Sequence, residues 1–334
     1  MEIRTEPRPT CLICGSRGAE LHSNLKDRLF GVPGNWSLKQ CSNSQCGLSW
    51  PDPMPSEEDI PLLYKAYYTH AQGGSRQQLI RRLRAFFYGG YMALAYLPSS
   101  LAGLRQARQQ VSGMFLNGLQ PGKLLDVGCG DGGFLHKMHQ LGWIASGLDF
   151  DEQAIKNARS RYGKSITVMH SDLFHAGFRE NEFDALTMNH VIEHVPDPVA
   201  LLKEVRRVLK IGGRLVVTTP NIRSLGHQLF RESWRGLEVP RHLQIFSRDA
   251  IRACAEKAGF EKIDVRTTAA NADTIVGASF SLREAKKNGD CASGSRVKIN
   301  FLRGLRSLWL QYQEAFQLRR DPDCGEELVL ICEK

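Results

Sequence analysis

Acidic residues are missing from one long stretch of this 334-residue sequence. No Asp or Glu occurs between Ile60 and Leu125, a span whose basic residues are Lys65, Arg76, Arg81, Arg82, Arg84, Arg105, Arg108 and Lys123. These residues account for nearly all of the formal net charge of +9. Such asymmetry indicates an anionic partner, whether a membrane surface, a nucleic acid or a phosphorylated substrate. A solvated helical face would explain the same charges without any partner.

Leader-like and uninterrupted apolar segments are also missing. The first ten residues, MEIRTEPRPT, are charged and broken by proline, so no signal peptide is predicted. The uncharged run 85–104 has the length of a spanning helix, but Gly89-Gly90 and Pro98 interrupt it. Because arginines flank the run, we expect segment 81–105 either to lie on an anionic membrane or to pack against protein. Segment 296–320, with aromatic residues and arginines at helical spacing, shares that membrane expectation.

The nine cysteines lack the even, closely spaced pattern of a disulfide framework. Scattered thiols are typical of a reducing compartment, so we expect a cytoplasmic protein, at most peripheral to the inner face of the membrane. Four of them form two close pairs about 27 residues apart, namely Cys11, Cys14, Cys41 and Cys46. Two such pairs can supply four thiolates to a tetrahedral structural Zn²⁺. The alternative is four free buried cysteines.

From residue 122 onward the sequence alternates strand and helix patterns. This rhythm predicts an α/β fold with a doubly wound, mostly parallel, seven-stranded Rossmann-like sheet. The whole chain then divides into a zinc ribbon over 1–55, a basic helical linker or cap over 56–120, and a main domain over 121–334. Within the main domain we expect a helical insertion at about 270–320.

The stretch LLDVGCGDGGFL places a glycine-rich loop between a strand and a helix. Its G-x-G-x-x-G pattern suits a dinucleotide as well as other nucleotide cofactors, and Asp149 at the end of the next strand can hold a ribose. Asp126 and Asp131 add negative charge, which would not help a loop that binds pyrophosphate. The same charge suits the cationic sulfonium and amino group of S-adenosylmethionine (SAM). Asp172, after the third strand, can accept a hydrogen bond from an adenine amino group.

In order along the chain, these motifs, with FDALTMNHVIEHVPDP and PRHLQIFS, resemble the class I SAM-dependent methyltransferases. The subgroup is the ubiquinone-biosynthesis O-methyltransferase-like superfamily, and the cysteine pairs resemble the zinc-ribbon extension of many bacterial members. The resemblance implies an enzyme of the EC 2.1.1 class that uses SAM. The residues it implies for cofactor binding are Asp126, Gly128, Gly130, Phe134, Asp149, Phe150, Asp172, Leu173 and Asn189.

Three histidines are candidates for the base that would deprotonate a methyl acceptor: His190, His242 and His194. His190, Glu193 and His194 have the spacing of a zinc-protease motif, His-x-x-Glu-His. We reject this interpretation, because Pro196 and Pro198 end any helix within about one turn. The ubiquinone-type relatives carry Glu-x-x-Glu-His here and are associated with a divalent metal. This sequence departs from that motif, since His190 replaces the first Glu.

The expected reaction is methyl transfer to an oxygen, or less readily a nitrogen or carbon, of a small-molecule, sugar or lipid-linked acceptor. An RNA methyltransferase is the alternative, which the ribbon and the basic span favour. Against it, the Asn/Asp-Pro-Pro-Tyr motif of exocyclic-amine methylation is absent after the fourth strand, so nucleic acid is the less favoured partner. A non-enzymatic scaffold with a vestigial SAM site is a third hypothesis, which the intact acids of the loop argue against. The sequence predicts neither the identity of the acceptor nor an oligomeric state.

Overall fold

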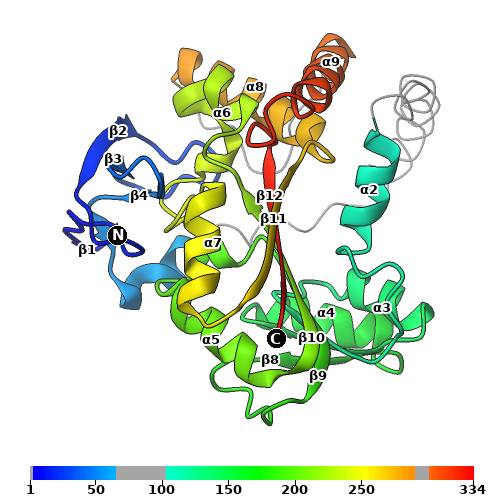
Figure 1. Cartoon of the computed structure of the whole chain (residues 1–334). Coiled ribbons are helices and arrows are strands. Elements are labelled where there is room, and N and C mark those ends of the chain that lie inside the picture. The colour runs from blue at the N-terminus through cyan, green and yellow to red at the C-terminus, as the bar shows by residue number, and fades with distance from the viewer. Residues whose placement is uncertain (1–2, 65–102, 290–300) are drawn as a thin grey trace.

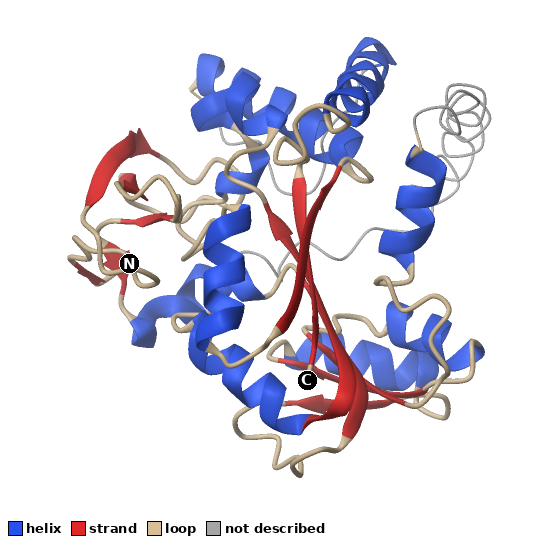
Figure 2. Ribbon diagram, viewed as in Figure 1, coloured by secondary structure: helices blue, strands red, loops and turns tan. Residues whose placement is uncertain are grey.

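The computed structural model describes residues 3–64, 103–289 and 301–334. Its centre is a seven-stranded sheet with helices on both faces (Figures 1 and 2). The strand order is β11-β12-β10-β9-β6-β7-β8. The strands are β6 (Lys123–Val127), β7 (Ile144–Asp149), β8 (Thr167–His170), β9 (Phe183–Asn189), β10 (Leu209–Pro220), β11 (Lys262–Thr268) and β12 (Glu327–Glu333). The predicted doubly wound, mostly parallel sheet is confirmed.

Only one strand of this sheet runs against its neighbours. β12 pairs antiparallel with both β10 and β11, whereas β10–β9, β9–β6, β6–β7 and β7–β8 are parallel pairs. Because of this reversal, the first residue of β12, Glu327, lies opposite Pro220 at the end of β10. Glu327 therefore lies at the carboxyl edge of the sheet, where ligands of open α/β sheets bind.

Helices α2, α3 and α4 lie on one side of the sheet, and α5 and α7 lie on the other (Figure 1). Helices α6, α8 and α9 gather beyond the carboxyl edge. The helices are α2 (Leu104–Ser112), α3 (Gly133–Gln140), α4 (Glu152–Tyr162), α5 (Pro198–Val208), α6 (Leu225–Phe230), α7 (Arg248–Lys257), α8 (Ala272–Asn288) and α9 (Phe301–Gln317). Asp151, Asp197 and Ser247 cap α4, α5 and α7, because the side chain of each accepts a hydrogen bond from a backbone N–H group in the first turn.

The N-terminal region forms a small three-stranded sheet in the order β2-β3-β4, beside a β1–β5 pair. The strands are β1 (Thr5–Glu6), β2 (Gly18–Leu25), β3 (Trp36–Cys41), β4 (Ser49–Pro51) and β5 (Met54–Pro55). This ribbon is packed on the main sheet's side that carries α7 (Figure 1). Leu48 and Trp50 share one hydrophobic cluster with Phe246 and Ile251, and Ser49 bridges to Ile245. The ribbon is therefore part of a continuous core.

The predicted helical linker is only partly visible. The helix expected after Ser56 is a 3₁₀ helix, η1 (Glu57–Tyr64), which contains Pro61. Residues 65–102 lie outside the described part of the chain, and with them all of segment 81–105 except its last three residues. The predicted helix within 296–320 is confirmed as α9 over its described residues.

Candidate functional site

The glycine loop leaves β6 at the carboxyl edge of the sheet. Gly128 and Gly130 have positive φ angles of 76° and 53°. A Cβ at Gly128 would lie 2.4 Å from Cγ2 of Val191, so this glycine allows the loop to pack against the turn after β9. By contrast, no atom lies within 4 Å of a Cβ placed at Gly130. Gly130 thus presents open backbone to which a ligand can come close.

Two buried carboxylates flank this open backbone. Oδ1 of Asp126 accepts a hydrogen bond of 2.6 Å from Oγ1 of Thr187, and burial, helped by nearby Asp149, raises the pKa of Asp126 to about 7. Oδ2 of Asp149 accepts a 2.8 Å hydrogen bond from the N–H of Gly130, and burial raises the pKa of this carboxyl too. Because buried carboxylates are costly without a counter-charge, the pair favours a ligand with cationic and hydroxyl groups.

By the resemblance, Phe150, Asp172 and Leu173 would contact the adenine of the cofactor, and the structure places these three residues in different ways. Phe150, directly after β7, is 59% exposed, and its ring meets that of Tyr64 edge-on with centroids 5.2 Å apart. Asp172 is exposed, and its carboxylate lies 2.8 Å from Nδ1 of His175. Leu173 is buried in the main core, so its side chain does not line a ligand site. Phe150 is the best placed of these three predicted residues.

By the resemblance, Phe134 would line the methionine end of the cofactor, and Asn189 would close the site after the fourth strand. Phe134, in the first turn of α3, is half-buried and packs against the cluster that contains Met114 and Leu116. Asn189, the last residue of β9, keeps an exposed side chain whose oxygen accepts a hydrogen bond from Oγ1 of Thr218. Asn189 is available to a ligand, whereas Phe134 mainly supports the loop.

His190 is held between two carboxylates. Its Nδ1 lies 3.0 Å from Oε1 of Glu193, and its Nε2 lies 2.8 Å from Oε1 of Glu327. Since carboxylate oxygens only accept, both ring nitrogens carry hydrogen and the ring is an imidazolium. Burial favours the neutral ring, but the hydrogen bonds to Glu193 and Glu327 outweigh it and raise the pKa of His190 to about 10. The prediction that His190 is a base is therefore disfavoured, because the ring is already protonated at neutral pH.

His194 and His242 lie ring to ring, with centroids 4.7 Å apart. Nδ1 of His242 lies 2.7 Å from the carbonyl oxygen of Gly236, and Nδ1 of His194 lies 3.1 Å from that of Arg241. Each Nδ1 must donate to its carbonyl, which leaves the lone pair on Nε2. Burial lowers the pKa of His242 to about 4, so its ring is neutral at pH 7. These two histidines present the lone pair that a base needs.

Glu193, His194 and His242 also approach one another as metal ligands would, with one donor atom of each within 4.8 Å of the others. However, Oε1 of Glu193 accepts a hydrogen bond from His190, and Oε2 accepts one of 2.9 Å from Oγ1 of Thr219. The imidazolium of His190 places a positive charge where the related Glu-x-x-Glu-His motif has a carboxylate. This donor set does not fit the divalent metal of that motif.

The four predicted zinc ligands come together in the ribbon. One sulfur from each of Cys11, Cys14, Cys41 and Cys46 lies within 4.8 Å of the others. The Sγ atoms of Cys11 and Cys46 are 3.7 Å apart, and those of Cys14 and Cys41 are 3.3 Å apart. Sulfur atoms at the corners of a tetrahedron with Zn–S bonds of about 2.3 Å are separated by similar distances. The cluster fits a structural zinc ion.

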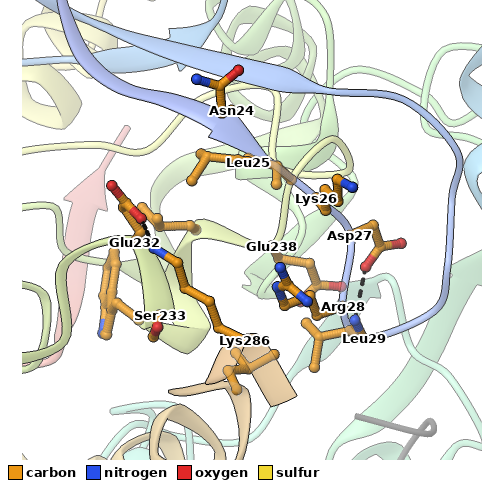
Figure 3. Close-up of a pocket in the computed structure, with 14 residues that line it drawn as sticks. Asn24, Leu25, Lys26, Asp27, Arg28, Leu29, Glu232, Ser233, Glu238 and Lys286 are labelled. Atoms are coloured by element: carbon orange, nitrogen blue, oxygen red, sulfur yellow. Dashed lines mark hydrogen bonds and ion pairs between the residues drawn. The ribbon is translucent and has the colours of Figure 1, made fainter. Parts of the chain in front are cut away.

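A hollow of about 520 Å³, open to solvent, lies between the ribbon and the helices beyond the carboxyl edge (Figure 3). Its walls come from the loop after β2, the segment that follows α6, and α8. Lys286 pairs with Glu232 across one wall. Oε2 of Glu238, which lines the hollow, lies 3.7 Å from Nε2 of His242. One carboxylate therefore connects the hollow with the histidine pair.

Sequence reasoning missed three residues that shape the site: Tyr64, Thr187 and Glu327. Their positions are 130 residues from His194, 61 from Asp126 and 137 from His190 respectively. No local motif signals such long-range pairs, because they follow from strand order and from the reversal of β12.

Comparison with known proteins identifies the relatives of this chain. A family model described as a methyltransferase domain matches residues 99–265, which is half of the chain. A ubiquinone biosynthesis O-methyltransferase from Haemophilus ducreyi is 34% identical over 113 residues, or 31% of this chain and 48% of that protein. The enzyme of the same name from Thiobacillus denitrificans is 38% identical over 103 residues, or 30% of this chain and 44% of that protein. The matches thus span about half the length of these curated relatives.

A solved structure shares the fold. The phosphoethanolamine N-methyltransferase 2 of Haemonchus contortus, in complex with phosphomonomethylethanolamine and S-adenosylhomocysteine, aligns with a TM-score of 0.50 at 17% identity. The alignment covers 91% of this chain and 70% of that chain. At that identity the likeness concerns the fold alone. None of the described helices combines the length and hydropathy needed to cross a bilayer.

Proposed function

This chain belongs to the SAM-dependent methyltransferase family, and from that premise we propose that it transfers a methyl group from SAM to an oxygen of a small-molecule, sugar or lipid-linked acceptor. The observation that carries the proposal is the open backbone at Gly130 between the buried carboxylates of Asp126 and Asp149. The names of the relatives, O-methyltransferases of ubiquinone biosynthesis, support oxygen as the acceptor atom.

Bound SAM supplies an activated methyl group and a neutral leaving group. Asp126 faces the loop from the end of β6 and supplies the negative charge that a sulfonium or amino group would neutralise. Asp149 both fixes the loop through the N–H of Gly130 and offers its carboxylate to ribose hydroxyls. Phe150 and Asn189, both exposed at the carboxyl edge, extend the site on either side of the loop.

The remaining task of the protein is to orient an acceptor hydroxyl and take its proton. We propose His194 as the base, with the ring of His242 packed against it. The Nδ1 atom of His194 faces a carbonyl oxygen, and its half-buried ring lies nearer to solvent than that of His242. The imidazolium of His190, clamped by Glu193 and Glu327, fixes the turn on which His194 lies.

We further propose that the cysteine cluster binds a structural zinc ion that holds the ribbon together. A segment of this size buries too little apolar surface to be stable without help. The proposed division is a ribbon over 1–55, a linker over 56–120 and the methyltransferase domain over 121–334, with α8 and α9 in its insertion at about 270–320.

The exposed face of α9 supports the proposed contact with an anionic membrane. The apolar side chains on that face are Leu302, Leu305, Trp309 and Phe316, which are 63%, 40%, 59% and 50% exposed. Exposed arginines accompany them at Arg306, Arg319 and Arg320. Tryptophan and leucine flanked by arginine are typical of helices that lie in an anionic lipid interface.

Flotation with phosphatidylserine vesicles tests the membrane proposal. Trp309→Ala with Leu302→Ala should reduce the bound fraction severalfold, whereas Ile211→Ala, at an 86% exposed apolar residue elsewhere, should leave it unchanged. Wild-type protein that stays unbound at low salt would rule the contact out.

Calorimetric titration with SAM and S-adenosylhomocysteine tests the proposed function. Asp149→Asn should weaken binding at least tenfold. Asp131→Asn should have little effect, contrary to the expectation from sequence, because the exposed carboxylate of Asp131 is already paired with Arg161. Transfer of labelled methyl groups should then be assayed with hydroxylated aromatic compounds, amines and RNA. Absence of any binding by the wild type would refute the cofactor assignment, and methylation of RNA alone would refute the acceptor class.

A further inference from the structure

Tyr64 lies outside the segment that matches the methyltransferase family, yet its side chain reaches the carboxyl edge of the main sheet. The residue ends η1 and is only 8% exposed. Its phenol oxygen is 2.9 Å from Nδ1 of His194, and its ring packs edge-on against Phe150. One side chain of the N-terminal extension thus contacts both the candidate base and the candidate adenine contact.

The ribbon helps to hold Tyr64 in this position. The preceding residue, Leu63, is fully buried in a cluster with Trp36 and Leu38 of β3. Earlier in η1, the carboxylate of Asp59 accepts a 2.8 Å hydrogen bond from the N–H of Arg4. The same cluster contains Ile222 and Trp234 of the main domain. The place of Tyr64 therefore depends on how the ribbon and the main domain pack together.

We infer that Tyr64 is a positioning residue of the active site, supplied by the N-terminal extension, which holds the hydrogen of His194 on Nδ1 and packs against Phe150. The inference rests on the proposed function of His194 as the base. Nδ1 of His194 lies between two oxygens, the phenol of Tyr64 at 2.9 Å and the carbonyl of Arg241 at 3.1 Å. The carbonyl can only accept, so the shared hydrogen is on Nδ1, and the phenol oxygen serves as a second acceptor.

This arrangement keeps the lone pair of His194 on Nε2, which is the state required for taking a proton from an acceptor. It also links the two halves of the site. The ring of Tyr64 lies against Phe150 beside the glycine loop, and its oxygen lies against the histidine pair. Cofactor binding at Phe150 would therefore change the surroundings of Tyr64, the residue that orients His194.

Tyr64→Phe separates the two contacts, because it removes the oxygen and keeps the ring. In nitrogen-15 spectra of the imidazole groups, with His194→Asn used for assignment, the ratio of the Nδ1–H to the Nε2–H form of His194 should fall roughly fivefold, as expected for the loss of one hydrogen bond. Binding of S-adenosylhomocysteine should stay within about twofold. Tyr64→Leu, which also removes the ring from Phe150, should weaken that binding in addition.

Tyr162→Phe is the matched control, since its ring stacks on His136 away from the histidine pair and should leave the His194 signals unchanged. Unchanged signals of His194 in Tyr64→Phe would overturn the inference, as would unchanged cofactor binding in a folded Tyr64→Leu protein. Loss of thermal stability alone would assign Tyr64 a merely structural role. These spectra can be recorded without a methyl acceptor. The proposed function fails on a different observation, namely wild-type protein that binds no cofactor.

Discussion

Nε2 of His190, directly after β9, donates a 2.8 Å hydrogen bond to Oε1 of Glu327, the first residue of β12. This bond joins the turn that carries His190 and His194 to the one reversed strand of the sheet. Nδ2 of Asn271 donates to the other oxygen of Glu327, so the carboxylate is held from both sides. The carboxyl edge of the sheet is thereby linked to β12.

Replacement of Glu327 should weaken the interaction with His190 and destabilise the fold. Glu327→Gln removes a nearly buried negative charge beside the imidazolium of His190 and should lower the free energy of unfolding by about 1.5–3 kcal/mol at pH 7. Glu333→Gln is the control on the same strand, because its ion pairs with Arg214 and Lys262 are more exposed and should contribute less than about 1 kcal/mol. Urea unfolding measures both changes in the free energy of unfolding. Equal losses in the two variants would show that the pair of Glu327 with His190 stabilises the fold no more than an exposed ion pair.

Two glycines of one loop should respond differently to alanine. Gly128→Ala forces a Cβ to within 2.4 Å of Val191 and should destabilise the fold by several kcal/mol, on the order of 3. Gly130→Ala meets no protein atom, so its stability cost should be only the roughly 1–2 kcal/mol of a left-handed non-glycine residue. Its methyl group would instead occupy the open side of the loop and reduce SAM affinity at least tenfold. Normal SAM affinity in folded Gly130→Ala would mean that the cofactor lies elsewhere.

The purified protein should contain zinc, and the metal should depend on the ribbon. Cys46→Ala removes one of the four clustered sulfurs, so elemental analysis should find the zinc content reduced to near zero, with lower thermal stability. Cys254→Ala removes a buried cysteine of α7 outside the cluster and should retain zinc, although it leaves a small cavity. Zinc retained fully in Cys46→Ala would contradict the four-cysteine site.

Acid should destabilise the contact between ribbon and main domain. His227 of α6 lies 3.0 Å from His22 of β2, and burial, aided by the charge of His22, lowers the pKa of His227 to about 4. The unfolded chain would bind a proton near pH 6.5, so it takes up more protons than the folded protein as the pH falls. The contribution of His227 to stability is complete above about pH 6.5 and is lost as the pH falls toward 4. From pH 7 to pH 5 the loss should be on the order of 2 kcal/mol.

His227→Gln should flatten that pH dependence, and urea unfolding at both pH values would measure the change. His139→Gln, at an exposed histidine of α3, should leave the slope as in the wild type. A slope that is unchanged in His227→Gln would assign the acid sensitivity to other groups, among them His242, whose pKa burial also lowers to about 4.

The sequence by itself determined the sheet, the glycine loop and the cysteine cluster. Each of these depends on residues close in the chain, whose spacing alone produces a strand, a tight turn or a pair of thiolates. Asp126 and Asp149 could be singled out for the same reason, because Asp149 ends β7 and Asp126 is the last residue but one of β6, beside the loop.

Only the tertiary structure decided which groups face the ring nitrogens of the histidines. The spacing of NHVIEHVPDP could not reveal that Glu327, more than a hundred residues away, would accept a hydrogen bond from His190 and so stabilise its protonated form. Nor could it reveal that carbonyl oxygens of Gly236 and Arg241 would leave His242 and His194 with the lone pair on Nε2. The charge state of an imidazole depends on what faces its two nitrogens, and those neighbours are brought by the packing of distant strands and of the ribbon.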